Sequence, residues 1–242
     1  MTDNLGVGNQ LNEFFSETYE QQRHDRYHIL VDELEVASIV GFVYDQIVLE
    51  AGCGTGIILF PVSTIAKEAH GTDSSDKKLS LARNKGLNVQ QAPPDKLPYE
   101  DNYFDLVYSF KLLPYTENVT EVIKEFSRVT KPGGLLKLEF YNSRCIRYFL
   151  NKLKPGKKNQ LNSGYIRYDD LKLIKSYLPE DLVIEKTEGL IIAGIFNFLY
   201  SVPVLSAVIK HIDNKLQHSK LACFGTYLIV TFRKTGQLEH KE

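Results

Sequence analysis

Cysteine is scarce in this chain, with three occurrences among 242 residues. Cys53, Cys145 and Cys223 are an odd number and show no paired ligand spacing, which argues against both a disulfide framework and a zinc site. Such cysteine usage fits a reducing compartment best. The chain is nevertheless long enough to bury a core without disulfides.

A surplus of basic charge is also lacking. The 29 lysines and arginines almost balance the 30 acids, so the formal net charge is -1 and nothing draws the whole protein onto a phosphate backbone. Nucleic acid is therefore not the expected partner. Residues 1–4 lack the basic region and apolar core of a secretion signal, so we predict a cytoplasmic protein.

The spacing of apolar residues alternates along the chain between that of helices and that of strands. Helical spacing covers 9–22, 25–40, 57–67, 77–85 and 117–130, and strand-like runs cover 46–51, 69–73, 88–91, 104–110, 135–141, 182–188 and 225–234. Alternating strands and helices imply right-handed crossovers and a mainly parallel α/β sheet. No repeat, low-complexity tract or linker divides the chain, so we expect a single domain.

A glycine pattern follows the first predicted strand, in residues 48–56, VLEAGCGTG. Gly52, Gly54 and Gly56 remove side chains where the backbone must turn tightly and where a ligand must touch the main chain. The helix that begins near Thr55 would direct its free N–H groups at the same point. The spacing is Gly-x-Gly-x-Gly, whereas the dinucleotide fingerprint has its third glycine one place later, where Ile57 stands. A structural turn without a ligand is the alternative.

A carboxylate, Asp73, closes the second predicted strand about 20 residues after the glycines. At this distance one helix and one strand bring an acid back beside the loop, where it can accept hydrogen bonds from ribose hydroxyls. A helix cap is the alternative role. Because Ser75 or Asp76 can cap the next helix, and Gly86 can stop it, Asp73 is free to bind a ligand.

Five segments together resemble the class I S-adenosylmethionine-dependent methyltransferases of the small-molecule type. They are VLEAGCGTG at 48–56, GTDSS at 71–75, DKLPY at 95–99, FDLV at 104–107 and RVTKPGG at 128–134. They occur in that family's order and spacing, and as a set they are far more specific than any one of them. The resemblance implies a Rossmann-like doubly wound sheet, mostly parallel with an antiparallel last strand, and helices on both faces.

The resemblance also implies a division of the chain and an S-adenosyl-L-methionine site. The expected parts are a helical cover at 1–40, a cofactor-binding core at 45–141, acceptor-side helices and an apolar lid at 142–223, the last strand at 224–234 and a polar tail at 235–242. The residues expected to bind the cofactor are Glu50, Gly52, Cys53, Gly54, Gly56, Asp73, Ser74, Asp95, Ser109, Tyr19 and Arg26. Glu50 would help to hold the methionine amino group, Asp73 the ribose hydroxyls and Arg26 the methionine carboxylate, although Arg26 fits an ordinary solvated charge equally well.

The adenine side departs from the family pattern. Relatives carry Gly-Asp-Ala shortly before Leu-Pro, whereas this chain has Ala92-Pro93-Pro94, which offers neither a carboxylate nor a proline N–H. Ser74 also replaces an apolar residue that packs against adenine. Asp95 or Gln91 could substitute through a shifted loop, adenine could be held by shape and stacking, or the cofactor site could be degenerate.

The candidates for catalysis are Tyr115 and Lys111. Tyr115 could orient or deprotonate an acceptor, but a phenol with a pKa near 10 is a poor base at neutral pH, and a packing role is as good an interpretation. Lys111 could steer an anionic acceptor or lie in solvent. His24 and His28 stand one helical turn apart without a recognisable third ligand, so no metal site is expected.

The choice of acceptor should depend on the residues after the fifth strand. Residues 144–158 are basic and aromatic, which indicates either a solvated helix or attraction of an anionic substrate or membrane surface. Residues 189–209 carry no charge, yet Gly194, Asn197 and Pro203 interrupt them, so we expect a lid rather than a transmembrane span. We predict methyl transfer by in-line displacement to a small acceptor, apolar or amphiphilic, lipid-like or anionic, with weak interfacial membrane contact. The alternatives are an inactive cofactor-binding protein of the same fold and, less favoured by the glycine spacing, a nicotinamide oxidoreductase.

Overall fold

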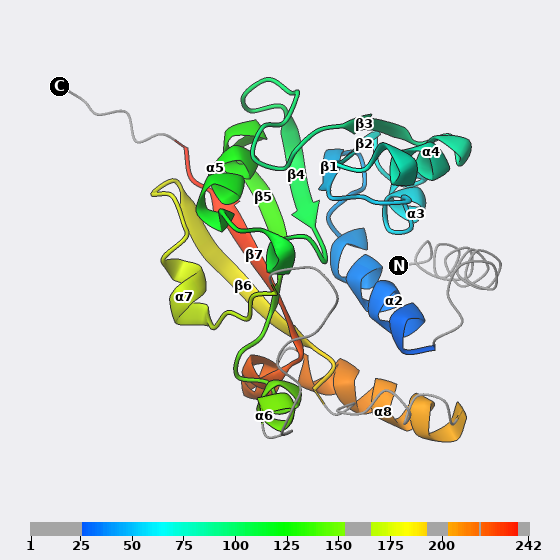
Figure 1. Ribbon diagram of the computed structural model, residues 1–242, viewed down its shortest axis with the longest axis vertical. Helices are drawn as coiled ribbons and strands as arrows, with labels where there is room; N and C mark the ends of the chain where they lie inside the picture. Colours follow the sequence, from blue (N-terminus) through cyan, green and yellow to red (C-terminus); the bar gives the residue numbers. More distant parts are fainter. Residues whose placement is uncertain (1–25, 153–165, 193–202, 218, 237–242) are drawn as a thin grey trace.

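The computed structural model describes residues 26–152, 166–192, 203–217 and 219–236. A seven-stranded sheet runs through them in the order β3-β2-β1-β4-β5-β7-β6 (Figure 1). Its strands are β1 (Ile47–Ala51), β2 (Glu68–Asp73), β3 (Asn88–Gln91), β4 (Phe104–Ser109), β5 (Thr130–Tyr141), β6 (Leu182–Leu190) and β7 (Tyr227–Lys234). The predicted helix over 9–22 lies outside the described residues, and so do Tyr19 and His24.

The strand pairing confirms the predicted fold class. β1 pairs in parallel with β2 on one side and with β4 on the other, so the winding direction reverses between β1 and β4. β7 is antiparallel to both of its neighbours, β5 and β6. In an open sheet of this kind, ligands bind beyond the carboxyl ends of the strands at the point of reversal. The fold therefore directs attention to the ends of β1 and β4.

Helices cover both faces of the sheet because successive strand residues point to opposite sides. On β1, Val48 packs into a cluster with helix α2 (Arg26–Val40), whereas Leu49 packs on the other side with α5 (Val119–Val129). Short helix α7 (Leu171–Lys175) joins the α5 side through Ile174. The remaining helices are α3 (Leu59–Ser63), α4 (Asp76–Asn84), α6 (Ile146–Lys152) and α8 (Pro203–Leu216), with 3-10 turns η1 (Leu113–Tyr115) and η3 (Lys220–Phe224).

Most predicted elements occur within one or two residues of their expected bounds, but the helix predicted over 57–67 is much shorter. α3 spans only Leu59–Ser63 because the glycine loop extends through Gly56, and because the chain must turn back early to begin β2 at Glu68. Ala66 already forms a β-bridge with Tyr44. Apolar spacing cannot show where such a return begins, since a buried turn and a buried helix share it.

The fifth strand starts earlier than predicted. β5 begins at Thr130, and its pairing with β4 slips between Phe104 and Leu106, so the Lys131–Gly134 turn is accommodated as an irregularity within the strand. Gly133 adopts a φ of 80°, which favours glycine. The Pro-Gly-Gly signal is therefore correctly placed but is part of the strand rather than its launch point.

The apolar run 189–209 is divided among several elements. Its first two residues complete β6, its last seven belong to α8, and 193–202 lie outside the described residues. Among the described helices, none combines the length and the apolar character needed to cross a bilayer.

Candidate functional site

The glycine loop between β1 and α3 is built by three left-handed residues. Gly52, Gly54 and Gly56 have φ values of 82°, 56° and 76°, a region that side chains with a Cβ rarely adopt. Space adds a second requirement at two of them: a Cβ on Gly52 would lie 3.1 Å from Leu112, and a Cβ on Gly56 would collide with Leu87. Each glycine of the predicted motif is therefore required by the local backbone.

Asp73, at the end of β2, holds this loop directly. Its Oδ2 accepts a hydrogen bond from the Gly54 N–H at 3.0 Å, and its Oδ1 accepts one from the Ser75 N–H at 2.8 Å. Ser75, not Asp73, caps α4, since its hydroxyl oxygen accepts from the Lys78 N–H. A carboxylate has about four lone-pair sites, so each Asp73 oxygen can still accept a hydroxyl hydrogen bond from a ligand.

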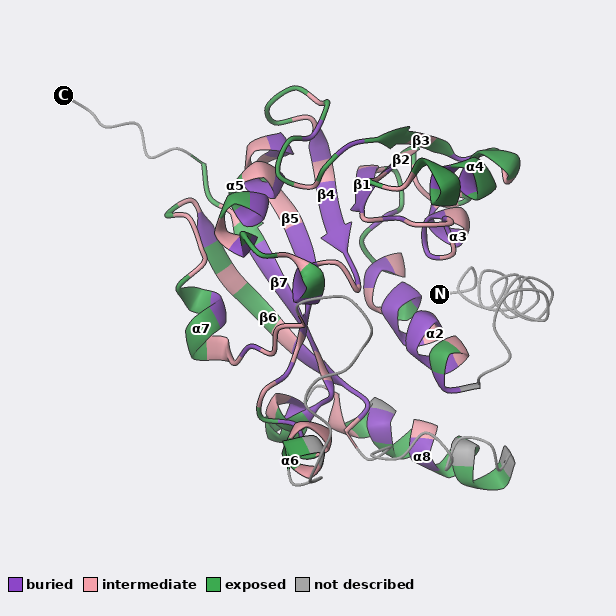
Figure 2. Cartoon of the chain, viewed as in Figure 1, coloured by how far each residue is buried: buried purple, intermediate pink, exposed green. Residues whose placement is uncertain are grey.

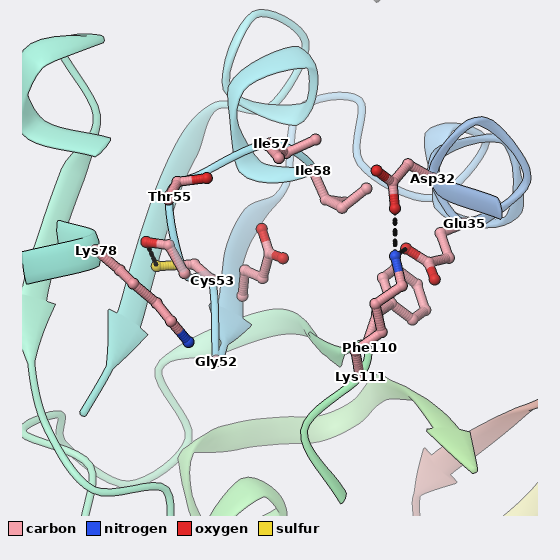
Figure 3. Close-up of a pocket in the computed structure, with 12 residues that line it drawn as sticks. Asp32, Glu35, Gly52, Cys53, Thr55, Ile57, Ile58, Lys78, Phe110 and Lys111 are labelled. Atoms are coloured by element: carbon pink, nitrogen blue, oxygen red, sulfur yellow. Dashed lines mark hydrogen bonds and ion pairs between the residues drawn. The ribbon is translucent and has the colours of Figure 1, made fainter. Parts of the chain in front are cut away.

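A cavity of about 220 Å³ opens beside the loop, at the carboxyl ends of β1 and β4 (Figure 3). It is smaller than the roughly 300 Å³ at which cavities for whole ligands begin, so it would enclose one end of a nucleoside cofactor. The lining residues are Asp32, Glu35, Glu50, Gly52, Cys53, Gly54, Thr55, Ile57, Ile58, Lys78, Phe110 and Lys111. Figure 3 shows α2 closing one side of the cavity with Asp32 and Glu35, while Lys78 reaches in from α4 on the other.

Lys111 crosses from the end of β4 to α2. Its ammonium group donates to Glu35 Oε2 at 2.9 Å and also pairs with Asp32 (Figure 3). Its backbone N–H donates to Glu139 Oε1 at 3.3 Å, and its φ of 58° is uncommon for a residue with a side chain. Desolvation disfavours the ammonium, but the Glu35 and Asp32 carboxylates outweigh it and raise the pKa of Lys111. Lys111 is therefore a charged, paired group that ties α2 to the sheet.

The carboxyl groups around Lys111 carry more negative charge than its ammonium can balance. Burial raises the pKa of Asp32 to about 7 despite its ion pair, and burial raises the pKa values of Glu35 and Glu50 well above their usual range. Glu35 Oε1 and Glu139 Oε2 are buried without a hydrogen-bond donor among the described residues. Buried carboxylates without donors attract a proton or a cation. This end of the cavity therefore suits a ligand that brings positive charge.

The predicted cofactor residues fall into two groups. Glu50, Gly52, Cys53 and Gly54 line the cavity, and Gly56 shapes the loop behind it. Ser109 does not line it: its hydroxyl group is fully buried and donates to the Ala51 carbonyl at 2.7 Å, which joins β4 to β1. Arg26 is the first described residue of α2, and Tyr19 lies outside the described residues.

On the predicted adenine side, no shifted carboxylate completes the cavity lining. Asp95 and Ser74 are both exposed and do not line the cavity. The Gln91 amide donates to the Ser74 carbonyl at 2.9 Å, and the Ala92 N–H donates to the Asp73 carbonyl at 3.2 Å. The two prolines lie in a tight turn that the Lys96 N–H closes on Pro93. Hydrogen-bonding groups of this segment are thus used to hold the segment against β2.

Tyr115, in η1, lies away from the cavity and begins a chain of tyrosines. Its hydroxyl group is 3.0 Å from that of Tyr141 at the end of β5, and the Tyr141 ring packs against Tyr227 at 5.3 Å. The Tyr227 hydroxyl group is 3.0 Å from that of Tyr27, over whose ring the Arg147 guanidinium lies at 4.9 Å. This tyrosine chain follows the same strand-end edge of the sheet as the cavity.

Sequence reasoning missed Asp32, Glu35 and Phe110, which line the cavity, and Tyr141, which meets Tyr115. One signal could have found the acids. Asp32 and Glu35 stand one helical turn apart in a helix whose other faces are largely apolar, and two acids on a buried stripe require a partner or a ligand. No comparable signal marks Phe110 or Tyr141.

The sequence is similar to those of known proteins. Residues 49–138 match the family model described as a methyltransferase domain. The uncharacterized methyltransferase YodH of Bacillus subtilis is 30% identical over 169 residues, which are 59% of this chain and 68% of that protein. Sterol 4-C-methyltransferase strm-1 of Caenorhabditis elegans is 30% identical over 94 residues, 36% of this chain but only 28% of that longer protein.

The fold comparison agrees. A solved structure from Thermotoga maritima, described as a SAM-dependent methyltransferase and possible histamine N-methyltransferase, superposes with a TM-score of 0.62 over 93% of this chain and 99% of its own. Its sequence identity is 16%, so the likeness concerns the fold alone. With the glycine loop, Asp73 and the reversal between β1 and β4, these matches show that the chain belongs to the S-adenosylmethionine-dependent methyltransferases of Rossmann-like fold.

Proposed function

We propose that this protein transfers a methyl group to a small amphiphilic acceptor. The observation that carries the proposal is the cavity at the ends of β1 and β4, with the glycine loop, Asp73 and buried carboxyl groups converging on it. When bound, S-adenosyl-L-methionine supplies an electrophilic methyl group on a sulfonium centre, open to in-line displacement. The protein then has to position an acceptor, exclude water and handle a proton where the acceptor must lose one.

The residues around the cavity fit such a cofactor in charge and in shape. Glu50 and Glu35 suit the ammonium of a methionine moiety, because a positive ligand favours their ionised forms, and once ionised they favour a sulfonium over its neutral product. Asp73, already aligned by the Gly54 and Ser75 amides, would hold the ribose hydroxyls. Ser74 and Asp95 are proposed to border an open adenine site in which shape and stacking replace hydrogen bonds.

The tyrosine chain is proposed as the acceptor wall. Burial and the hydrogen bond with Tyr115 raise the pKa of Tyr141, so its hydroxyl group stays protonated and can donate a hydrogen bond to an acceptor oxygen. Tyr115, which is half exposed, would complete that contact from η1. In this proposal both tyrosines orient the acceptor, while Lys111 holds α2 over the cofactor and acts on the acceptor only through its charge.

An amphiphilic acceptor fits the surroundings of this wall. The tyrosine rings offer apolar faces with polar rims, and Arg147 offers a cation at the far end of the chain of rings. The name of one relative, Sterol 4-C-methyltransferase, supports an acceptor with apolar bulk. The cytoplasmic location stays a prediction.

Calorimetry with S-adenosyl-L-methionine and with S-adenosyl-L-homocysteine tests the cofactor site. Both should bind the wild-type chain, and Asp73→Ala should weaken binding at least about a hundredfold because it removes the ribose acceptor and two loop hydrogen bonds. Asp76→Ala is the matched control, since this exposed acid of α4 pairs with Arg83 on the surface. Wild-type affinity in Asp73→Ala, or no binding of either compound to the wild type, would contradict the proposal.

Turnover separates an enzyme from a protein that only binds the cofactor. Transfer of an isotopically labelled methyl group into an organic-soluble product, from mixed lipid-soluble acceptors, is the expected result. Tyr141→Phe should lower this turnover while leaving the affinity for S-adenosyl-L-homocysteine unchanged, because Tyr141 lies outside the cofactor cavity. Equal losses of both would place Tyr141 in the cofactor site instead.

A further inference from the structure

Three elements beyond the strand ends present apolar side chains to solvent. On α8, Val204, Leu205, Val208 and Ile212 are exposed, with Val204 77% exposed and Val208 50%. Val204, Val208 and Ile212 stand four residues apart and so form one stripe along the helix. Figure 2 colours parts of α8 as exposed. An amphipathic helix normally buries its apolar face, so a solvent-facing apolar stripe indicates a binding surface.

The stripe continues onto η3 and α6. η3 follows α8 after three residues and exposes Leu221 and Phe224, while α6 exposes Ile146 and Phe149. The side chain of Asn142, just before α6, donates to the Cys223 and Gly225 carbonyls, which fixes the start of α6 against η3. The docking face is defined here as the exposed apolar residues of these three elements. Figure 1 shows all three at one end of the molecule, past the ends of β5 and β6.

Basic residues predominate in the segments that carry the docking face. Residues 142–152 and 203–224 each contain three lysines or arginines, and their only acid is Asp213. One of these cations, Lys210, pairs with Glu33 of α2 at 2.6 Å. Asp213 is 3% exposed and accepts a hydrogen bond from the Ile192 N–H at 2.8 Å, so it contributes little negative charge to the surface. Arg144, Lys152, Lys215 and Lys220 are exposed. The whole protein has a net charge of -1, so this face departs from the average of the chain.

We propose that the docking face binds the surface of an anionic phospholipid membrane. Apolar side chains rimmed by lysine and arginine are the pattern by which helices lie in a bilayer interface, with aromatic and aliphatic residues below the headgroups and basic groups among the phosphates. The described helices include none long enough to cross the bilayer, so the contact is peripheral. This inference rests on the proposed function, because membrane contact would place the tyrosine chain beside acceptors dissolved in the membrane.

The link to the acceptor wall runs through α6. Arg147 of α6 donates to the Tyr27 hydroxyl group at 3.0 Å, and Tyr148 of α6 packs against Tyr168, which in turn packs against Tyr141. η3 leads directly into β7, whose first residue is Tyr227. The elements that carry the docking face are therefore joined directly to the tyrosine chain.

Vesicle flotation with the full chain tests the inference. We expect the wild type to float with equimolar phosphatidylcholine and phosphatidylglycerol at low salt, to float less with phosphatidylcholine alone, and to be released as salt rises. Val208→Ser with Ile212→Ser should weaken the anionic binding at least about tenfold, because half-exposed side chains lose their insertion into the bilayer. Lys215→Glu with Lys220→Glu should weaken it by a similar factor.

The matched control is Leu173→Ser with Val183→Ser. These residues are 42% and 47% exposed, but they lie on α7 and at the start of β6, which Figure 1 shows away from α6 and α8, and should not affect flotation. Equal flotation with both kinds of vesicle, or equal losses in the control and in Val208→Ser with Ile212→Ser, would overturn the inference. So would sedimentation showing a dimer that these two serines dissociate while no vesicle binds.

Cofactor calorimetry on the same variants separates the two proposals. Val208→Ser with Ile212→Ser should bind S-adenosyl-L-homocysteine as the wild type does, because neither residue lines the cavity. Absent flotation with intact cofactor binding would refute the docking face alone. Absent cofactor binding with intact flotation would refute the proposed function alone.

Discussion

Replacing Lys111 by methionine should destabilise the protein in a pH-dependent way. The substitution keeps the length of the side chain but removes the ammonium that pairs with Asp32 and Glu35. Both carboxyl groups are almost completely buried, and Lys111 itself is 27% exposed. Removal of one partner from a buried ion pair typically costs about 3–5 kcal/mol, because the other charge is left without compensation.

The size of the effect can be worked out for Asp32. A buried carboxylate can become neutral by binding a proton. At about pH 8 the free energy of protonating a group with an ordinary pKa of 3.8 is about 6 kcal/mol. In the wild type the folded pKa of about 7 limits that cost to about 4 kcal/mol. In Lys111→Met, Asp32 thus adds about 1–2 kcal/mol to the loss of unfolding free energy at about pH 8 and almost nothing at about pH 5.5. Two lost hydrogen bonds, at about 1 kcal/mol each, add about 2 kcal/mol at both pH values, so the expected totals are about 3–4 kcal/mol at about pH 8 and about 2 kcal/mol at about pH 5.5.

The sign is set by proton binding. Asp32 has a raised pKa in the folded state, so the folded protein binds the proton more tightly than the unfolded chain does. Stability associated with Asp32 is therefore fully present below its unfolded pKa of about 4 and is lost as the pH rises through about 7. Removing Lys111 should deepen that loss at the alkaline end of this window.

Urea denaturation at the two pH values measures the effect, with Lys124→Met as the control. Lys124 pairs with Glu121 on the surface of α5, and both side chains are more than half exposed, so its removal should cost less than about 1 kcal/mol at either pH. A loss in Lys111→Met below about 1 kcal/mol at about pH 8, or the same loss at both pH values, would refute the account of the cluster.

The glycine loop allows two further tests. Gly56→Ala should lower the free energy of unfolding by about 2–3 kcal/mol, since the new Cβ would collide with Leu87. Gly86→Ala is the control: Gly86 has a similar φ of 77° but lies in open space, so its substitution should cost only about 1 kcal/mol. Equal shifts of the melting temperature in the two variants would show that the collision with Leu87 does not matter. Iodoacetamide should label Cys223 at least about tenfold faster than Cys53, because burial raises the pKa of the Cys53 thiol. Mass spectrometry of the peptides measures the rates, and comparable labelling would mean that the loop opens readily.

Local patterns were sufficient for the cofactor half of the fold. Spacing and turn residues placed β1, β2, β3 and α4 to within a residue or two, because each is bounded by a strong local signal such as the Ser75 cap or the stop at Gly86. The bounds failed where tertiary contacts overrode periodicity. Of the helix predicted over 57–67, only α3 forms, because the residues before it belong to the glycine loop and Ala66 after it forms a β-bridge.

Long-range contacts decided the rest of the site. Lys111 was expected to steer an anionic acceptor or to lie in solvent. Its partners, Asp32 and Glu35, lie more than seventy residues earlier, and no local spacing connects them. The contact between Tyr115 and Tyr141 also joins residues that no local spacing connects. The uncharged run 189–209 suggested a lid, and the exposure of Val204, Leu205 and Val208 on α8 became visible only in the folded chain.

The sequence by itself determined the glycine loop, the acid at the end of the second strand and the alternation that makes a parallel sheet. These features depend on φ angles, turn chemistry and periodicity, which act over a few residues. The tertiary structure alone decided which buried charges meet and which apolar side chains remain exposed. It also decided that the Asp73 carboxylate accepts a hydrogen bond from the glycine loop. Those outcomes depend on how separate elements pack, and desolvation in the packed state sets their energies.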